Sequence, residues 1–146
     1  MPYQLEPVLN AFPEWRCLLR VEMADDGSLY EALEVDASPS ANAMHGLLIK
    51  TSNEEITVGF DFYHTHFDDS VGDGTYFGTM AALEFIKQIK SEQLAVMSWW
   101  RGDQWCGSSS ILATEKPELP SWCNRLDINR IRIRSWCGTL NADIDV

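Results

Sequence analysis

Residues 77–92 read FGTMAALEFIKQIKSE, and this stretch decides the fold class because it has clear helical periodicity. Its apolar positions recur at i, i+3, i+4 and i+7 and are Ala82, Phe85, Ile86 and Ile89. The opposite face is polar and carries Glu84, Lys87, Gln88 and Ser91. We therefore predict one amphipathic helix, from about 77 to 92, that packs on an apolar surface.

Short segments with the pattern of β-strands lie on both sides of this helix. Before it they are 15–23, 29–35, 47–51 and 56–67, and after it 94–100, 104–112, 129–136 and 139–144. Turn residues separate several neighbours, and strands joined by short turns pair antiparallel. The sequence predicts an α+β fold, in which a mostly antiparallel sheet of about eight strands carries one main helix. A chain of 146 residues is most simply a single domain, 1–146.

The charge is distributed unevenly along the chain. Residues 1–73 contain fourteen acidic and three basic side chains, a net charge of −11, whereas residues 74–146 contain eight of each. A strongly negative surface attracts positively charged partners and repels nucleic acid. By charge complementarity we therefore expect a basic protein partner, and no direct contact with nucleic acid.

The amino-terminal sequence, MPYQLEPVLNAF, lacks a basic segment followed by a long apolar run, and no stretch is apolar enough to span a membrane. These features predict a cytoplasmic protein. The cysteines, Cys17, Cys106, Cys123 and Cys137, form no CxxC pair or zinc-site spacing, which predicts reduced thiols. Three of them follow a tryptophan, so one member of each such pair is expected to face the core.

The segment 56–69 is the densest in chemically versatile side chains. If one strand runs through it, His64, His66 and Asp68 share a face, and two histidines with a carboxylate can bind a metal ion. The HxD half of an iron-oxygenase triad is present, but no histidine follows His66 and only His45 remains. The favoured interpretation is that His64 and His66 are structural, hydrogen-bonded at a sheet edge, with metal binding and partner contact as alternatives.

A row of arginines alternates with isoleucines near the carboxyl terminus. Arg130, Arg132 and Arg134 fall on one face of the predicted strand, and Ile131 and Ile133 fall on the other. We expect the arginines to pair with acidic side chains of neighbouring strands, each pair contributing roughly 0.2–1 kcal/mol. An anionic ligand or partner is the alternative.

Catalytic signatures are missing from the sequence. The serines at 108–110 lack a surrounding GxSxG, and no P-loop, GxGxxG or HExxH pattern is present. We therefore predict no catalytic residue, no cofactor and no metal, and expect a binding protein rather than an enzyme.

Four segments of this small acidic chain resemble a known class of proteins. They are VGFDFYHTHFDD, ALEFIKQI, AVMSWWRGDQWCGSS and NRIRIRSWCGTLN, and lie between roughly 55 and 141. They resemble the immunity proteins of bacterial polymorphic and contact-dependent growth inhibition toxin systems. The resemblance implies a cytoplasmic protein that binds a cognate toxin, often a basic nuclease, and neutralises it by occluding its active site. It assigns no functional residue.

The partner-binding surface is expected in the acidic first half, centred on the loop after residue 67. The predicted contact residues are Asp61, Tyr63, His64, His66, Phe67, Asp68, Asp69 and Asp73. Glu54 and Glu55 are expected at the opposite end of the strand, where they contribute less. The alternative function is a small metal-dependent enzyme or ligand-binding protein that uses His64, His66 and Asp68, and a third is a subunit of a larger assembly.

Overall fold

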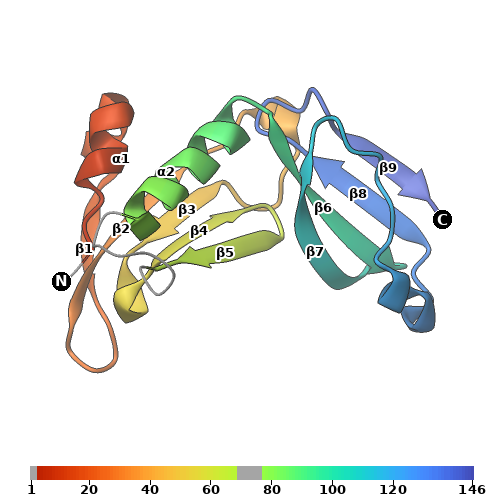
Figure 1. Cartoon of the computed structure of the whole chain (residues 1–146), viewed down its shortest axis with the longest axis horizontal. Helices are drawn as coiled ribbons and strands as arrows, with labels where there is room; N and C mark the ends of the chain where they lie inside the picture. Colours follow the sequence, from red (N-terminus) through yellow and green to blue (C-terminus); the bar gives the residue numbers. More distant parts are fainter. Residues whose placement is uncertain (1–2, 69–76) are drawn as a thin grey trace. The chain divides into compact units, whose positions relative to one another are not determined.

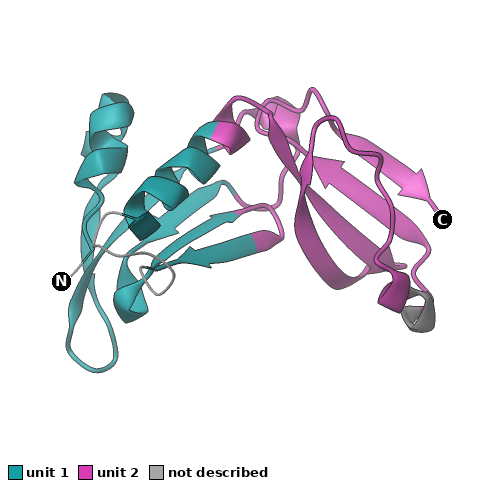
Figure 2. Ribbon diagram, in the orientation of Figure 1, with its two compact units in different colours: residues 1–36, 46–59, 64–87 teal, residues 37–45, 60–63, 88–146 magenta. Residues whose placement is uncertain are grey.

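A computed structural model describes residues 3–68 and 77–146, with only the backbone of residues 124–126 (Figure 1). The described residues form two antiparallel sheets and one main helix, which confirms the predicted α+β class. The first sheet has the order β1-β2-β3-β4-β5 and the second has the order β7-β6-β8-β9. The chain divides into two compact units (Figure 2). Whether they make up one domain stays a prediction.

Unit 1 consists of Met1–Asp36, Gly46–Gly59 and His64–Lys87, and unit 2 consists of Ala37–His45, Phe60–Tyr63 and Gln88–Val146. The strands of the first sheet are β1 (Arg20–Met23), β2 (Leu29–Val35), β3 (Leu47–Lys50), β4 (Ile56–Phe60) and β5 (Tyr63–Phe67). Those of the second are β6 (Leu94–Arg101), β7 (Gln104–Leu112), β8 (Arg130–Arg134) and β9 (Ala142–Asp145). The α-helices are α1 (Glu6–Ala11) and α2 (Phe77–Lys90). The 3-10 helices are η1 (Pro13–Leu18), η2 (Pro39–Ala41), η3 (Ser52–Glu54) and η4 (Ser121–Leu126).

The strand predicted over 15–23 is wrong in its first half, which forms η1. Pro13 opens this helix, and its fixed φ suits a first helical position. Phe12 stacks on Trp15 with ring centroids 4.3 Å apart, and Trp15 is buried. The apolar residues that alternate in the sequence before residue 19 therefore belong to a helical turn. Only Arg20–Met23 form a strand.

The turn predicted between β1 and β2 is confirmed. The N–H of Gly27 donates to the carbonyl of Ala24 (2.9 Å), and the N–H of Ala24 donates to the carbonyl of Ser28 (2.8 Å). Gly27 has φ of 85°, in the left-handed region where a residue without a side chain is least strained. This glycine lets a short loop match the twist of the two strands.

The single strand predicted over 56–67 is also wrong, because the chain reverses at Asp61 and Phe62 to form β4 and β5. Asp61 adopts a left-handed φ of 53°. Its N–H donates to the carbonyl of His45 (3.1 Å), and its Oδ1 accepts a hydrogen bond from the N–H of Met44 (2.8 Å). The segment contains neither glycine nor proline at the turn, so its pattern resembles one long strand. The reversal accounts for the nine strands of the described residues, where about eight were predicted.

Helix α2 confirms the predicted amphipathic helix, with an end two residues earlier. Ala82, Ile86 and Ile89 are fully buried, whereas Lys87 is exposed. The ring of Phe85 lies 5.7 Å from that of Phe67 on β5. Figure 1 shows α2 running across one face of the first sheet, so Ala82, Phe85 and Ile86 form the core of unit 1 together with the sheet.

The second sheet has its own core in unit 2. The buried cluster contains Ala95, Met97, Trp99, Ile111, Cys123, Ile131 and Ile133. Two of the tryptophan–cysteine pairs place their cysteine toward this cluster, as predicted, because Trp105 and Trp122 are exposed. The other face of β8 carries the arginine row, so the predicted alternation of this strand is confirmed.

Replacing Ile86 with aspartate should destabilise the protein strongly. Ile86 has no exposed surface, so Ile86→Asp places an unpaired charge in the core and lowers the free energy of unfolding by about 3 kcal/mol or more. Lys87→Asp is the neighbouring control and should change it by less than about 0.5 kcal/mol. Urea unfolding followed by circular dichroism measures both. Equal midpoints for the two variants would show that the assigned packing face is wrong.

Replacing Asp61 should destabilise the turn between β4 and β5. Asp61→Ala removes the acceptor for the Met44 N–H and leaves a β-carbon in a left-handed backbone, a combined cost of about 2 kcal/mol. Asp61→Asn keeps an oxygen acceptor and the side-chain type that best tolerates this backbone. The asparagine variant should therefore unfold at a higher urea concentration than the alanine variant. An alanine variant as stable as the wild type would contradict the role assigned to the turn.

Candidate functional site

Acidic side chains gather at one end of the first sheet. Asp25 and Asp26 lie in the turn between β1 and β2, Glu54 and Glu55 lie in the connection from β3 to β4, and Asp68 follows β5. Antiparallel strand order brings these three connections to the same end, as Figure 1 shows for the β1–β2 turn and η3. We call these five residues the acidic end. The prediction that Glu54 and Glu55 lie opposite Asp68 is wrong, because the Asp61 turn reverses the chain.

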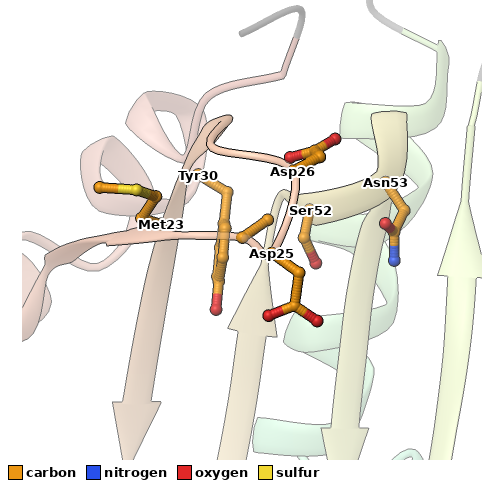
Figure 3. A pocket seen from close by; sticks show the side chains of 7 residues that line it. Met23, Asp25, Asp26, Tyr30, Ser52 and Asn53 are labelled. Atoms are coloured by element: carbon orange, nitrogen blue, oxygen red, sulfur yellow. The ribbon is translucent and has the colours of Figure 1, made fainter.

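The surface of the acidic end is hollowed between the β1–β2 turn and η3. One hollow of about 420 Å³ is lined by Met23, Ala24, Asp25, Asp26, Tyr30, Ser52 and Asn53. A second, of about 780 Å³, shares four of these residues and extends to Ser28, Leu29, Thr51 and Glu54. Figure 3 shows the side chains of Asp25 in the β1–β2 turn, Tyr30 on β2 and Ser52 in η3 projecting in a similar direction. The end of the sheet therefore has a concave surface with acidic walls.

Local hydrogen bonds set the charge states at this hollow. Asp26 Oδ1 accepts hydrogen bonds from the hydroxyl (2.6 Å) and the N–H (2.9 Å) of Ser28, and these bonds lower the pKa of Asp26. The Tyr30 hydroxyl donates to Glu22 Oε2 (2.9 Å), which raises the pKa of Tyr30. At neutral pH Asp26 is therefore ionised and Tyr30 is neutral.

Exposed apolar side chains border the acidic end. Val21, Met23 and Leu29 are 59%, 68% and 53% exposed, and we call these three residues the apolar rim. Met23 lies opposite Leu29 in the β1–β2 register. Strand alternation alone assigns Val21 and Met23 to the core, but β1 is the outermost strand and leaves them uncovered. Sequence reasoning missed this patch, because the edge position of β1 is not encoded in its own residues.

Glu54 occupies an unfavourable backbone conformation. Asn53 and Glu54 are consecutive residues in the left-handed region, with φ of 62° and 56°. Asparagine tolerates this region, whereas glutamate is disfavoured there by about 1 kcal/mol. Glu54 is exposed, so its side chain supplies no buried contact that would explain the choice of residue. Backbone strain retained at an exposed acidic position is consistent with selection for a surface role.

The two predicted histidines lie on β5, at an edge of the first sheet. His66 Nδ1 is 2.9 Å from Thr57 Oγ1 and 3.1 Å from Glu55 Oε1, so His66 is hydrogen-bonded at the sheet edge, as the structural interpretation expects. The exposed ring of His64 lies 5.1 Å from that of His66. Across residues 3–68 and 77–146, no three histidine, cysteine or acidic side chains are grouped so that they could hold a metal ion.

The other predicted contact residues occupy different environments. Asp61 is 5% exposed and its carboxylate is bonded to the N–H of Met44, so we leave it out of the binding surface. Phe67 packs against the helix ring of Phe85. Tyr63 is half-buried at the start of β5. The predicted residues Asp69 and Asp73 lie outside the described part of the chain.

Asp68 is exposed, and its backbone passes close to the first turn of α2. A β-carbon at Gly78 would lie 2.8 Å from the carbonyl carbon of Asp68, so the glycine permits this approach. Asp68 is therefore both a predicted contact residue and a member of the acidic end. Asp68 is thus the residue shared by the predicted contact set and by the surface formed by the β1–β2 turn and η3.

The arginine row is largely engaged within unit 2. Arg134 Nη1 lies 3.1 Å from Asp143 Oδ1, which confirms the predicted cross-strand pairing for this arginine. Arg132 Nη2 donates to the carbonyl of Asn42 (3.0 Å), and the Arg130 guanidinium lies 5.3 Å from the centre of the Trp100 ring. Burial lowers the pKa of Arg132, and the charge of Arg134 lowers it further. These contacts assign the row a mainly structural role.

The helices of the chain and its comparison with known proteins complete the description. Within the described residues, no helix has the length and apolar character needed to cross a membrane. Comparison with known proteins finds no family model, no curated protein and no solved structure that matches the chain.

Proposed function

We propose that this chain is an immunity protein, which uses the acidic end to bind a basic surface of a cognate bacterial toxin and occludes the toxin's active site. The observation that carries the proposal is the location of the charge. Unit 1 contains fourteen acidic and four basic side chains, a net charge of −10, whereas unit 2 contains eight and seven, a net charge of −1. The acidity of the chain is therefore a property of one unit.

The acidic end suits a basic protein surface better than other ligands. Clustered carboxylates repel one another, which opposes folding, but they accelerate association with a cationic partner. They also resemble the phosphates that a nuclease binds, so a nuclease toxin is the partner class that fits best. Nucleic acid itself would be repelled by the same charge.

The apolar rim can provide binding affinity, which the charge alone supplies only weakly. Charge complementarity mainly affects association rate and specificity, whereas buried apolar contacts account for much of the affinity of protein interfaces. Val21, Met23 and Leu29 lie on the hairpin that carries Asp25 and Asp26. An apolar patch beside an acidic hollow therefore forms a surface that can both attract and retain a basic protein.

The proposed compartment is the cytoplasm, where an immunity protein meets an imported toxin. The cysteines carry free thiols, and Cys17 and Cys137 are exposed, an arrangement that suits a reducing compartment. The alternative of a metal-dependent enzyme at His64, His66 and Asp68 has less support. His66 is engaged by Thr57 and Glu55, and the described residues offer no metal-ligand group.

Reversing charge at the acidic end should slow binding. The partner for this test is the product of a toxin-sized reading frame immediately upstream of the gene. Asp25→Lys with Glu54→Lys should lower the association rate at low salt by about tenfold and flatten its dependence on ionic strength. Surface plasmon resonance at several salt concentrations measures both quantities.

The matched control is Asp103→Lys with Glu118→Lys, which makes the same change in charge at exposed positions of unit 2. This control should retain most of the wild-type rate and its salt dependence. Equal effects of the two double variants would show that the acidic end has no specific role in binding. Failure of the upstream product to bind the wild-type chain would overturn the proposed function.

Glu54→Gly should separate stability from binding. Glycine relieves the left-handed backbone, so the free energy of unfolding should rise by about 1 kcal/mol, while the loss of charge slows association with the same partner. Glu54→Ala removes the same charge but keeps a β-carbon, so it should slow association without the gain in stability. A glycine variant that binds as fast as the wild type would show that Glu54 has no role in binding.

A further inference from the structure

We propose that the open edge of β1 accepts an extended, basic segment of the partner protein as an additional strand of the first sheet. This inference rests on the proposed function and specifies how the partner binds. It concerns residues of unit 1 alone. It follows from the hydrogen-bonding pattern of β1, from the exposure of its side chains and from the charge around it.

The backbone of β1 has unused hydrogen-bonding groups. β1 is the first strand in the sheet order and pairs only with β2 among the described strands. The N–H of Ala24 donates to the carbonyl of Ser28 (2.8 Å), so this position points toward β2. Because bonded and non-bonded positions alternate along an antiparallel pair, the N–H and C=O groups of Val21 and Met23 face the open edge.

The opposite strand agrees with this assignment. Glu31 is the partner of Val21 in the register, and its carbonyl accepts a hydrogen bond from the N–H of Thr51 (3.0 Å), away from β1. Val21 and Met23 therefore present both main-chain groups in the spacing that a further strand requires. Such strand addition is a recurring mode of peptide recognition.

The outward-facing positions of this edge carry apolar side chains. Proteins usually guard an edge strand with charged residues, proline or a bulge, because an open edge pairs readily with other chains. Here the two residues whose backbone faces outward are apolar and 59% and 68% exposed. A strand added beside them would cover Val21 and Met23 with its own apolar side chains.

The charges around the β1 edge indicate the composition of the strand that it would accept. On the other face of β1, Glu22 and Glu34 both pair with Arg20, at 3.0 and 3.6 Å, and Asp25 and Asp26 follow at the end of the strand. The complementary strand is therefore apolar on one face and rich in lysine or arginine on the other. Edge-to-edge pairing of two copies is disfavoured, because it would bring together two units of net charge −10.

Amide hydrogen exchange of the full chain tests the inference with defined probes. The first probe is a peptide of about ten residues that alternates valine and lysine, and its control alternates valine and glutamate. Exchange of the Val21 and Met23 amides should slow at least about tenfold with the basic peptide and remain unchanged with the acidic one. Protection by neither peptide, or equal protection by both, would overturn the proposal.

A pair of variants adds an independent measurement. Val21→Pro removes the outward N–H without interrupting the bonds to β2, and proline is tolerated at such an edge position. Val21→Thr keeps the N–H and is the matched control. The proline variant should lose protection at Met23 and bind the basic peptide at least about tenfold more weakly than the threonine variant. Equal binding would contradict strand addition, and the wild-type exchange result decides the question if the proline variant does not fold.

The outcomes separate this inference from the proposed function. If the upstream product binds the wild-type chain and the Val21→Pro and Val21→Thr variants equally, strand addition is wrong and the proposed function stands. If that product does not bind the wild-type chain, the proposed function fails, while the peptide experiment still decides whether the edge accepts a basic strand. Protection that rises with protein concentration without peptide would identify a second copy as the occupant and overturn the proposal.

Discussion

The hydrogen bond from the Met44 N–H to the Asp61 carboxylate holds the turn on which the arrangement of the first sheet depends. Asp61 accepts a left-handed backbone there, and the chain reverses after β4 instead of continuing. Without that reversal there would be no β5, and Asp68 would lie at the opposite end of the sheet from Glu54 and Glu55. A single side chain with a structural role thus determines which charged residues become neighbours.

The acidic end opposes folding at the same time as it creates a binding surface. Like charges repel, and the left-handed backbone of Glu54 adds about 1 kcal/mol of strain. The buried stripe of α2 and the apolar face of the first sheet offset these costs. Because the unfavourable features lie on connections between strands, they can be retained without disturbing the core. This separation of a rigid sheet from functional connections is common in binding proteins.

Several parts of the fold could be predicted because local pattern and burial agree. Helix α2 has one apolar stripe, and β8 alternates isoleucine with arginine, so each pattern identifies a core face. Two segments were misleading for physical reasons. Phe12 and Trp15 stack within a helical turn although their surroundings alternate like a strand. The Asp61 turn lacks glycine and proline, so nothing in its local sequence indicates a turn. The bond from Met44 that holds it comes from a residue distant in the sequence and could not be predicted. The acidic charge was evident in the sequence, but its collection at one end depends on this turn, and the exposed edge of β1 depends on sheet order.

The central claim is that the acidic end of unit 1 contacts the partner. Chemical-shift mapping of the isotopically labelled chain with the upstream gene product tests it most directly. The account predicts that the largest changes fall on the amides of the β1–β2 hairpin, on η3 and on Asp68. Changes confined to the arginine row of β8 and its neighbours in unit 2, with an unaltered β1–β2 hairpin, would contradict it.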